Sequence, residues 1–208
     1  MPQRLTRTER QAKTRADLLE AAARVFAQRG YDAASVTEIA EEAGYSHGAV
    51  YSNFEGKEEL FLALYEEWVA RRVAELELTW SHEGTLAERA RAAADDWMRS
   101  LARDPEPFLL RLEFTARAAR DPGLRRRLGT RVGAVPLAIR RLIEEAADGE
   151  ARRLPLSPDE LALALQALSL GLALETLSNP DAVRPGVGGD VVALLIELLG
   201  ERAARAPR

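Results

Sequence analysis

The chain has 208 residues, is 47% hydrophobic with only 6% aromatic residues, and carries a formal net charge of −4. A chain of this length can bury roughly 70% of its unfolded surface, and an apolar share dominated by alanine and leucine favours helices over sheets. The absence of cysteine excludes disulfides, thiolate metal sites and a cysteine nucleophile, and two histidines leave little for zinc, so we expect no cofactor, no metal and no catalytic residues.

The first residues are basic, and those that follow are acidic. Residues 1–15 carry five basic side chains against one acidic side chain, whereas residues 16–60 carry three basic against nine acidic. We interpret residues 1–14 as a basic flexible arm in which Arg4, Arg7 and Arg10 are available to phosphates. A solvated, frayed end is the alternative interpretation. No apolar segment follows Met1, so no signal peptide is expected.

Three helices are predicted next. The three- and four-residue spacing of apolar side chains over Ala12–Arg29 predicts an amphipathic helix that ends at Gly30. Ser35 and Glu38 form a capping box that opens a short helix ending at Gly44. Ser46 caps a second short helix over residues 47–54. Two short helices joined by a glycine-containing turn, after a longer helix, describe a helix-turn-helix.

The second short helix has the composition of a surface that faces phosphate. Residues 44–54 contain no acidic side chain, although acids are dense on either side. Gly48 and Ala49 are small enough for close approach to a base edge, and Ala49 could touch a thymine methyl group. The alternative is a set of three helices packed for stability alone.

Residues 15–65 resemble the N-terminal domain of TetR/AcrR-family transcriptional regulators. The resemblance is carried by Thr37-Glu38-Ile39-Ala40, Ala43-Gly44-Tyr45-Ser46, Val50-Tyr51-Ser52-Asn53-Phe54 and Lys57-Glu58-Glu59-Leu60. It implies an all-α homodimer that binds operator DNA, often as a repressor released by a small ligand. The expected organisation is a DNA-binding domain over 15–60 and a helical effector-binding and dimerisation domain over 61–208, with about nine helices in all.

Two positions depart from the family pattern. The family commonly has His or Tyr where this chain has Asn53, and a basic residue where it has His47. Both lie on the expected recognition helix, so the operator sequence cannot be carried over.

In a helix-turn-helix the second helix enters the major groove and the first crosses the backbone. Alternatives stay open for several contacts: His47 could be merely solvated, Tyr51 could be a core residue, and Asn53 could cap a helix end instead of touching phosphate. Besides the arm, the predicted DNA contacts are Thr37, Tyr45, Ser46, His47, Gly48, Ala49, Tyr51, Asn53 and Lys57.

In the rest of the chain, capping residues, prolines and glycines mark the ends of further predicted helices. Helices are expected over residues 60–78, 86–103, 106–119, 122–148, 158–178 and 191–203, with a glycine-rich loop over 185–189. The apolar run from Leu161 to Leu174 is shorter than the ~20 residues of a membrane span. We therefore expect no membrane partner and a cytoplasmic protein.

Two apolar helices near the end of the chain predict self-association. Both carry apolar residues on more than one side, so one side needs a partner; a monomer whose other helices cover both is the alternative. The predicted dimer-interface residues are Leu161, Ala164, Leu168, Gly171, Leu172, Val192, Leu195 and Leu199.

A cavity for a small apolar effector is plausible but not visible in the sequence. Glu113 and Arg117, four residues apart, could form a surface ion pair or hold a charged group of a ligand. The candidate wall residues are Trp68, Trp97, Met98, Phe108, Leu112, Glu113 and Arg117.

The favoured function is a sequence-specific DNA-binding regulator released from a palindromic operator by that unidentified effector. The alternatives are an effector-independent regulator, a dimeric interaction protein and, against the residues present, an all-helical enzyme. The sequence does not identify the effector, the operator or the regulated genes, nor distinguish repressor from activator.

Overall fold

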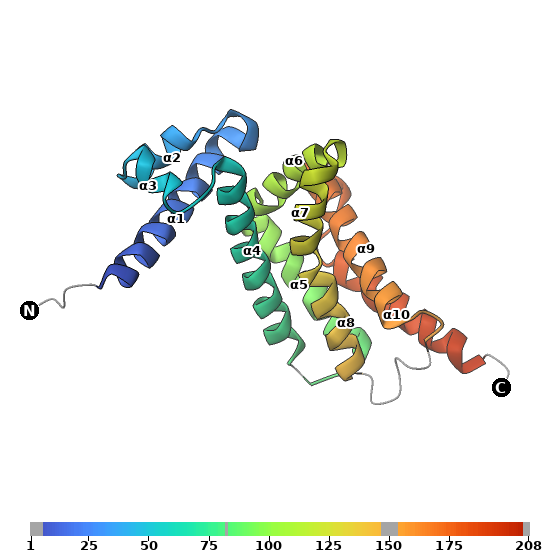
Figure 1. Cartoon of the computed structure of the whole chain (residues 1–208). Helices are drawn as coiled ribbons and strands as arrows, with labels where there is room; N and C mark the ends of the chain where they lie inside the picture. The colour runs from blue at the N-terminus through green and yellow to red at the C-terminus, as the bar shows by residue number, and fades with distance from the viewer. Residues whose placement is uncertain (1–5, 82, 147–153, 206–208) are drawn as a thin grey trace, which may run out of the picture. The chain divides into compact units, whose positions relative to one another are not determined.

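The computed structural model describes residues 6–81, 83–146 and 154–205. Across these ranges the secondary structure is helical, with no strand, which confirms the all-α class (Figure 1). The helices are α1 (Arg7–Ala33), α2 (Val36–Ala43), α3 (His47–Tyr51), α4 (Lys57–Trp80), α5 (Leu86–Arg103), α6 (Glu106–Arg120), α7 (Pro122–Val132), α8 (Ala134–Ala146), α9 (Pro158–Ser178), a short 3-10 helix (Pro180–Ala182) and α10 (Val187–Arg205).

The chain divides into two compact units. The first comprises Met1–Trp68 and Glu106–Arg131, and the second comprises Val69–Pro105 and Val132–Arg208. In the first unit α1 packs against α2 and α6, and α2 packs against α3. In the second unit α5 packs against α10, and α8 packs against α9. The helices that carry the expected DNA contacts therefore share a unit with α6, which is far away in the sequence.

An aromatic cluster forms the centre of the first unit. Phe61 of α4 stacks on Phe114 of α6 with ring centroids 4.0 Å apart, and Tyr31 meets Phe114 edge-on at 5.0 Å. Phe26 lies 5.7 Å from Tyr31. Phe26, Phe61 and Phe114 are fully buried. Offset-stacked and edge-to-face pairs each add stability beyond the apolar area they bury, so this cluster ties α1 to α4 and α6.

Helix α1 begins earlier than the sequence interpretation expects. Thr6 caps it by accepting a hydrogen bond from the Glu9 amide, and the Glu9 carboxylate accepts one from the Thr6 amide at 2.7 Å. This capping box satisfies two amide donors that would otherwise be unpaired at the helix start. Residues 7–14 are consequently helical, where a flexible arm was expected. Arg4 lies outside the described residues.

The turn and cap residues of the helix-turn-helix are confirmed. Ser35 and Glu38 form the expected capping box, and Ser46 accepts a hydrogen bond from the Ala49 amide. Gly44 adopts φ 72° and ψ 26° between α2 and α3, a left-handed conformation that suits glycine. Gly30 adopts φ 71° and kinks α1, which continues for one more turn to Ala33.

Two boundaries in the second half of the chain differ from the prediction. The helix expected over 122–148 is two helices, α7 and α8, separated at Gly133. Pro136 is the third residue of α8, where its missing amide donor costs nothing and its ring blocks a helix continuing from the preceding turn.

The last helix, α10, begins at Val187 rather than at Val191. Asp95 of α5 accepts a hydrogen bond from the Gly189 amide at 3.2 Å, and a Cβ at Gly189 would lie only 2.5 Å from the Asp95 carboxylate. The glycines that suggested a loop therefore allow close packing of a helix.

Candidate nucleic-acid interface

Helix α3 is short and presents small or polar side chains to solvent. Val50 is its buried anchor, with no exposed surface, whereas Tyr51 is 53% exposed and His47 and Gly48 are exposed. A Cβ at Gly48 would meet only the Ser46 hydroxyl, at 3.9 Å. Packing within the chain therefore does not require glycine at this position. The absence of a side chain at Gly48 instead leaves the backbone at the start of α3 accessible from solvent.

The two aromatic rings of α3 lie next to each other on this surface. The His47 and Tyr51 rings are 4.9 Å apart with an interplanar angle of 65°. Residues one helical turn apart face the same side, so the imidazole and the phenol together form one exposed edge. Both can donate and accept hydrogen bonds.

Several carboxylates near α3 are already paired with basic side chains. Lys13 donates to Asp17 at 2.7 Å, and Arg24 bridges Glu20 and Glu42. The Lys13 ammonium, followed by the Tyr45 hydroxyl, lowers the pKa of the Asp17 carboxyl below its usual value. These contacts place two cations against three carboxylates and so neutralise most of their charge locally.

Two predicted contact residues hydrogen-bond within the unit instead of projecting freely. The Tyr45 hydroxyl donates to Asp17 Oδ2 at 2.7 Å, which links the turn to α1. The Asn53 side-chain amide donates to the Ala49 carbonyl at 2.8 Å and so caps the end of α3, one of the two roles considered for it. Arg15, which the sequence counted among the phosphate-facing basic residues at the start of the chain, instead donates to the Asn53 carbonyl at 3.0 Å and lies 4.2 Å over the Phe54 ring.

Lys57 differs most from its expected role. Its ammonium donates to the carbonyls of Tyr31, Asp32 and Ala34 at 2.8, 3.0 and 2.9 Å. An ammonium has three protons, so all of its donors are used at the C-terminal end of α1. Burial lowers the pKa of the Lys57 ammonium. Its position is that of a helix-end cap rather than of a free phosphate contact.

The other predicted DNA contacts remain exposed. Thr37 is exposed in the first turn of α2, and Arg7 and Arg10 are exposed at the start of α1. Ser46 is exposed but uses its hydroxyl oxygen to cap α3. Ala49 is half-buried behind Gly48. The structure thus brings His47, Gly48 and Tyr51 together on one short helix, with Ser46 as its N-cap.

The candidate effector residues are divided between the two units. Trp68 and Leu112 are half-buried and Phe108 is buried in the first unit. Glu113 and Arg117 do not pair with each other as considered. The Glu113 carboxylate accepts a hydrogen bond from the Tyr31 amide, and Arg117 pairs with Asp32. Glu113 and Arg117 line an open, largely charged cleft of about 560 Å³ on that unit.

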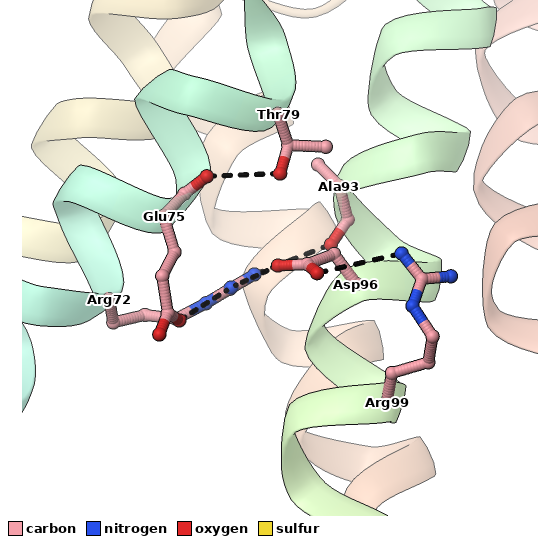
Figure 2. A network of polar contacts seen from close by, with 6 residues as sticks. All are labelled: Arg72, Glu75, Thr79, Ala93, Asp96 and Arg99. Carbon is pink, nitrogen blue, oxygen red and sulfur yellow. Dashed lines mark hydrogen bonds and ion pairs between the residues drawn. The ribbon is translucent and has the colours of Figure 1, made fainter.

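In the second unit Arg72, Glu75, Asp96 and Arg99 form a polar network (Figure 2), and the candidate Trp97 lies beside Arg72. The Arg72 guanidinium lies 5.3 Å from the Trp97 ring centroid and donates to Asp96 Oδ2 at 3.2 Å and to the Ala93 carbonyl at 3.3 Å. The Trp97 indole donates to the Ser169 carbonyl at 3.3 Å. Met98 is half-buried against Gly188. These contacts give Trp97 and Met98 packing roles between α5 and its neighbours.

Exposed hydrophobic residues also occur on α9 and α10, and we call them the apolar face. Its members are the exposed large hydrophobic residues of these two helices: Leu163, Leu174, Val191, Leu194 and Leu198. By length and composition α9 could also cross a membrane, and only 22% of its apolar window is buried within the chain.

The residues of the apolar face are not the residues predicted for the dimer interface, most of which are turned toward the chain's own core. Leu161 and Val192 are 1% and 3% exposed and belong to the core of the second unit. Leu168, Leu195 and Leu199 are partly buried against that core, Ala164 and Leu172 are half-buried, and Gly171 is exposed. The exposed hydrophobic residues lie on the same two helices as the predicted interface residues, but at other positions. Self-association through these helices stays a prediction.

Comparison with known proteins identifies the class. Residues 18–64 match the profile of the bacterial regulatory proteins of the tetR family, and residues 86–200 match the C-terminal profile of BetI-type transcriptional repressors. The chain therefore belongs to the TetR family of DNA-binding transcriptional regulators.

Individual relatives agree with this assignment. The chain is 34% identical over 148 residues to the HTH-type transcriptional repressor AcnR of Corynebacterium efficiens, covering 69% of this chain and 72% of that protein. A transcriptional regulator from Pseudomonas aeruginosa PAO1 has the same fold, with a TM-score of 0.77, 24% identity and coverage of 97% and 95%. The regulator FadR from Bacillus subtilis, solved in complex with stearoyl-CoA, also has this fold, with a TM-score of 0.72 and 18% identity. The match covers 87% of this chain and 96% of that protein.

Proposed function

We propose that this chain acts in the cytoplasm as a dimeric repressor that inserts α3 into the major groove of a near-palindromic operator. The observation that carries the proposal is the α3 surface: an N-capped helix, anchored by Val50, that exposes His47, Gly48 and Tyr51 in an acid-free stretch. Side chains at the start of a recognition helix contact base edges, and hydroxyl and amide groups around it contact phosphates. Binding rather than catalysis is the proposed activity.

We assign the contacts according to what each side chain is free to do. His47 and Tyr51 are proposed to contact bases or phosphates, Gly48 and Ala49 to allow close approach, and Thr37 to bind phosphate at the start of α2. Arg7 and Arg10 are proposed to release counterions from flanking phosphates. Tyr45, Asn53 and Lys57 are proposed instead to hold the helices in place, because their polar groups are used within the unit.

The test of DNA binding is gel retardation with duplexes tiled across the DNA upstream of the protein's own gene. Wild type should retard a small subset of duplexes, and His47→Ala and Tyr51→Phe should each weaken binding to that subset. Gln28→Ala, at an exposed position of α1, is the matched control and should bind like wild type. Retention of full affinity by both α3 variants would refute the contact assignment.

The apolar face supports a homodimer. Five large hydrophobic side chains exposed on two helices form a surface that would be stabilised by burial at roughly 25 cal/mol per Å² of apolar area. A second copy of the chain offers the same surface, as a two-fold interface requires. Dimerisation would place two α3 helices roughly 34–36 Å apart, one helical turn of DNA.

We further propose that a small apolar ligand releases the operator. Support comes from the match to the BetI-type C-terminal profile and from the stearoyl-CoA complex of the Bacillus subtilis protein, which has the same fold. A ligand can do this only if it binds the released state more tightly than the DNA-bound state. Titration of the operator complex with acyl-CoAs of increasing chain length should lower operator affinity. An unchanged affinity across the series would exclude this ligand class.

A further inference from the structure

The turn that joins α1 to α2 has backbone groups that a helix does not satisfy. Gly30 adopts φ 71° and ψ 168°, which interrupts the helical hydrogen bonding of α1 just before Tyr31. The chain then makes one more turn before Ser35 caps α2. Buried amides and carbonyls that lack a partner cost free energy comparable to a lost hydrogen bond. We call residues 30–34 the α1–α2 turn.

Helix α6 supplies the missing acceptor. The Glu113 carboxylate accepts a hydrogen bond from the Tyr31 amide at 2.8 Å, across 82 residues of sequence. A Cβ at Gly30 would lie 3.1 Å from a Glu113 oxygen, so the carboxylate lies directly against the backbone of the turn. One helical turn further along α6, Arg117 pairs with Asp32 at 2.8 Å.

Helix α4 supplies the missing donors. The three protons of the Lys57 ammonium go to three carbonyls of the α1–α2 turn. The side chains of Lys57 and Arg117 also lie over the Tyr31 ring, 4.7 and 5.6 Å from its centroid. The turn is therefore held by side chains from two other helices.

We propose that Glu113 is a positioning residue for operator binding, which acts by fixing the Tyr31 amide and thereby the orientation of α2 and α3. The inference rests on the proposed function. Ser35 begins α2 four residues after Tyr31, and α2 packs against both α1 and α3. A change in the α1–α2 turn is thus transmitted to α3.

The decisive experiment compares Glu113→Ala with Glu113→Gln. Both variants remove the same negative charge, but only glutamine keeps an oxygen that can accept the Tyr31 amide. Affinity is measured by fluorescence anisotropy on the operator and on a scrambled duplex, at a temperature where circular dichroism shows each protein fully folded. We expect Glu113→Ala to weaken operator binding about 10-fold, as for loss of a hydrogen bond to a charged group, and Glu113→Gln to stay within about 3-fold of wild type. Affinity for the scrambled duplex should be the same in both variants.

Two further measurements separate positioning from stability. Hydrogen exchange at the Tyr31 amide should accelerate in Glu113→Ala and stay near the wild-type rate in Glu113→Gln. Leu101→Ala, which removes a buried side chain of the second unit, should lower the melting temperature without changing operator affinity.

The outcomes are distinguishable. Equal operator affinities for Glu113→Ala and Glu113→Gln would overturn the inference while the proposed function stands. Failure of the wild-type protein to bind any operator would overturn the proposed function, and this inference with it.

Discussion

The exposed surface of α3 and the apolar face of α9 and α10 are opposite in character. On α3 and its two caps the exposed residues are a glycine, a histidine, a tyrosine and two serines, whose polar groups can hydrogen-bond to water or phosphate. On the apolar face they are four leucines and a valine. Exposed leucines gain nothing for a monomer, whereas burial against a partner would remove their apolar area from water. Each surface therefore indicates the chemistry of its partner. The polar surface of α3 suits the hydrated phosphate backbone and base edges of DNA, and the exposed leucines of α9 and α10 suit another apolar surface.

The two surfaces also differ in how they are held. Helix α3 is too short to be stable alone and depends on caps and on side chains from α1. Helices α9 and α10 have 21 and 19 residues and rest on the core of the second unit. We therefore expect mutations near α3 to act through local geometry, and mutations on the apolar face to act through assembly. The following predictions test that difference, from the largest expected effect to the smallest.

Leu194→Glu should convert a dimer into a monomer and weaken operator binding at least about 100-fold, because each dimer would bury two unpaired carboxylates at a cost of several kcal/mol each. Sedimentation velocity and anisotropy measure the two effects. Leu78→Glu is the matched control, since Leu78 is 72% exposed on α4 and outside the apolar face. A dimeric Leu194→Glu protein would remove α10 from the interface.

Lys57→Met should lower the free energy of unfolding by about 2–3 kcal/mol, because three carbonyls lose their charged donor. Urea denaturation measures this loss. The salt dependence of operator binding should keep the wild-type slope if Lys57 caps α1. A slope smaller by about 1.8, or about 0.9 for each chain of the dimer, would instead mean that Lys57 neutralises a phosphate, as the sequence alone suggested.

Tyr51→Ala should weaken operator binding about 10-fold, or about 1.4 kcal/mol, through loss of one hydrogen bond and of ring contact. The protein should stay dimeric, since Tyr51 is on the polar surface and 53% exposed. Anisotropy and sedimentation on the same sample check both points. A monomeric variant would show that the two surfaces are not independent.

Arg7→Ala with Arg10→Ala should reduce the slope of log affinity against log salt by about 3.6, the effect of four neutralised phosphates, two for each chain of the dimer. The affinity difference should fade as salt is raised. Arg202→Ala with Arg205→Ala, at the end of α10, removes the same charge from the second unit and should leave the slope unchanged. Equal slopes for wild type and the α1 variant would exclude the start of α1 from the interface.

Glu38→Gln should remove a small part of the acid sensitivity of folding. The Ser35 hydroxyl and amide lower the pKa of the Glu38 carboxyl below its usual 4.5. A depressed pKa stabilises the folded state above pH 4.5, and this stabilisation is lost as the pH falls through the lowered value. Urea denaturation between pH 3 and pH 6 should show a shallower decline for the variant than for wild type. Parallel declines would contradict this role.

Local signals in the sequence predicted much of the fold. The caps at Ser35, Ser46 and Ser157 and the left-handed turn at Gly44 each depend on residues within four positions, so a linear reading finds them. The start of α1 at Arg7 had the same kind of signal in Thr6 and Glu9, which the sequence interpretation missed.

Contacts between distant segments could not be read from the sequence. The partners of Tyr45, Lys57 and Glu113 lie 28, 23–26 and 82 residues away. Spacing within one helix says nothing about such pairs. The sequence also could not predict which side of α9 is buried. A helix that is apolar on all sides does not indicate which side its own chain covers.

The central claim is that two copies of α3 read adjacent turns of one duplex. Its most direct test is hydroxyl-radical footprinting of the wild-type complex on the retarded upstream duplex, with the protein-to-DNA ratio measured by sedimentation. The account predicts two protected tracts of related sequence, centred about 10–10.5 base pairs or a multiple of that spacing apart, and an even number of chains per duplex. A single protected tract bound by one chain, or no protection at low ionic strength, would contradict it.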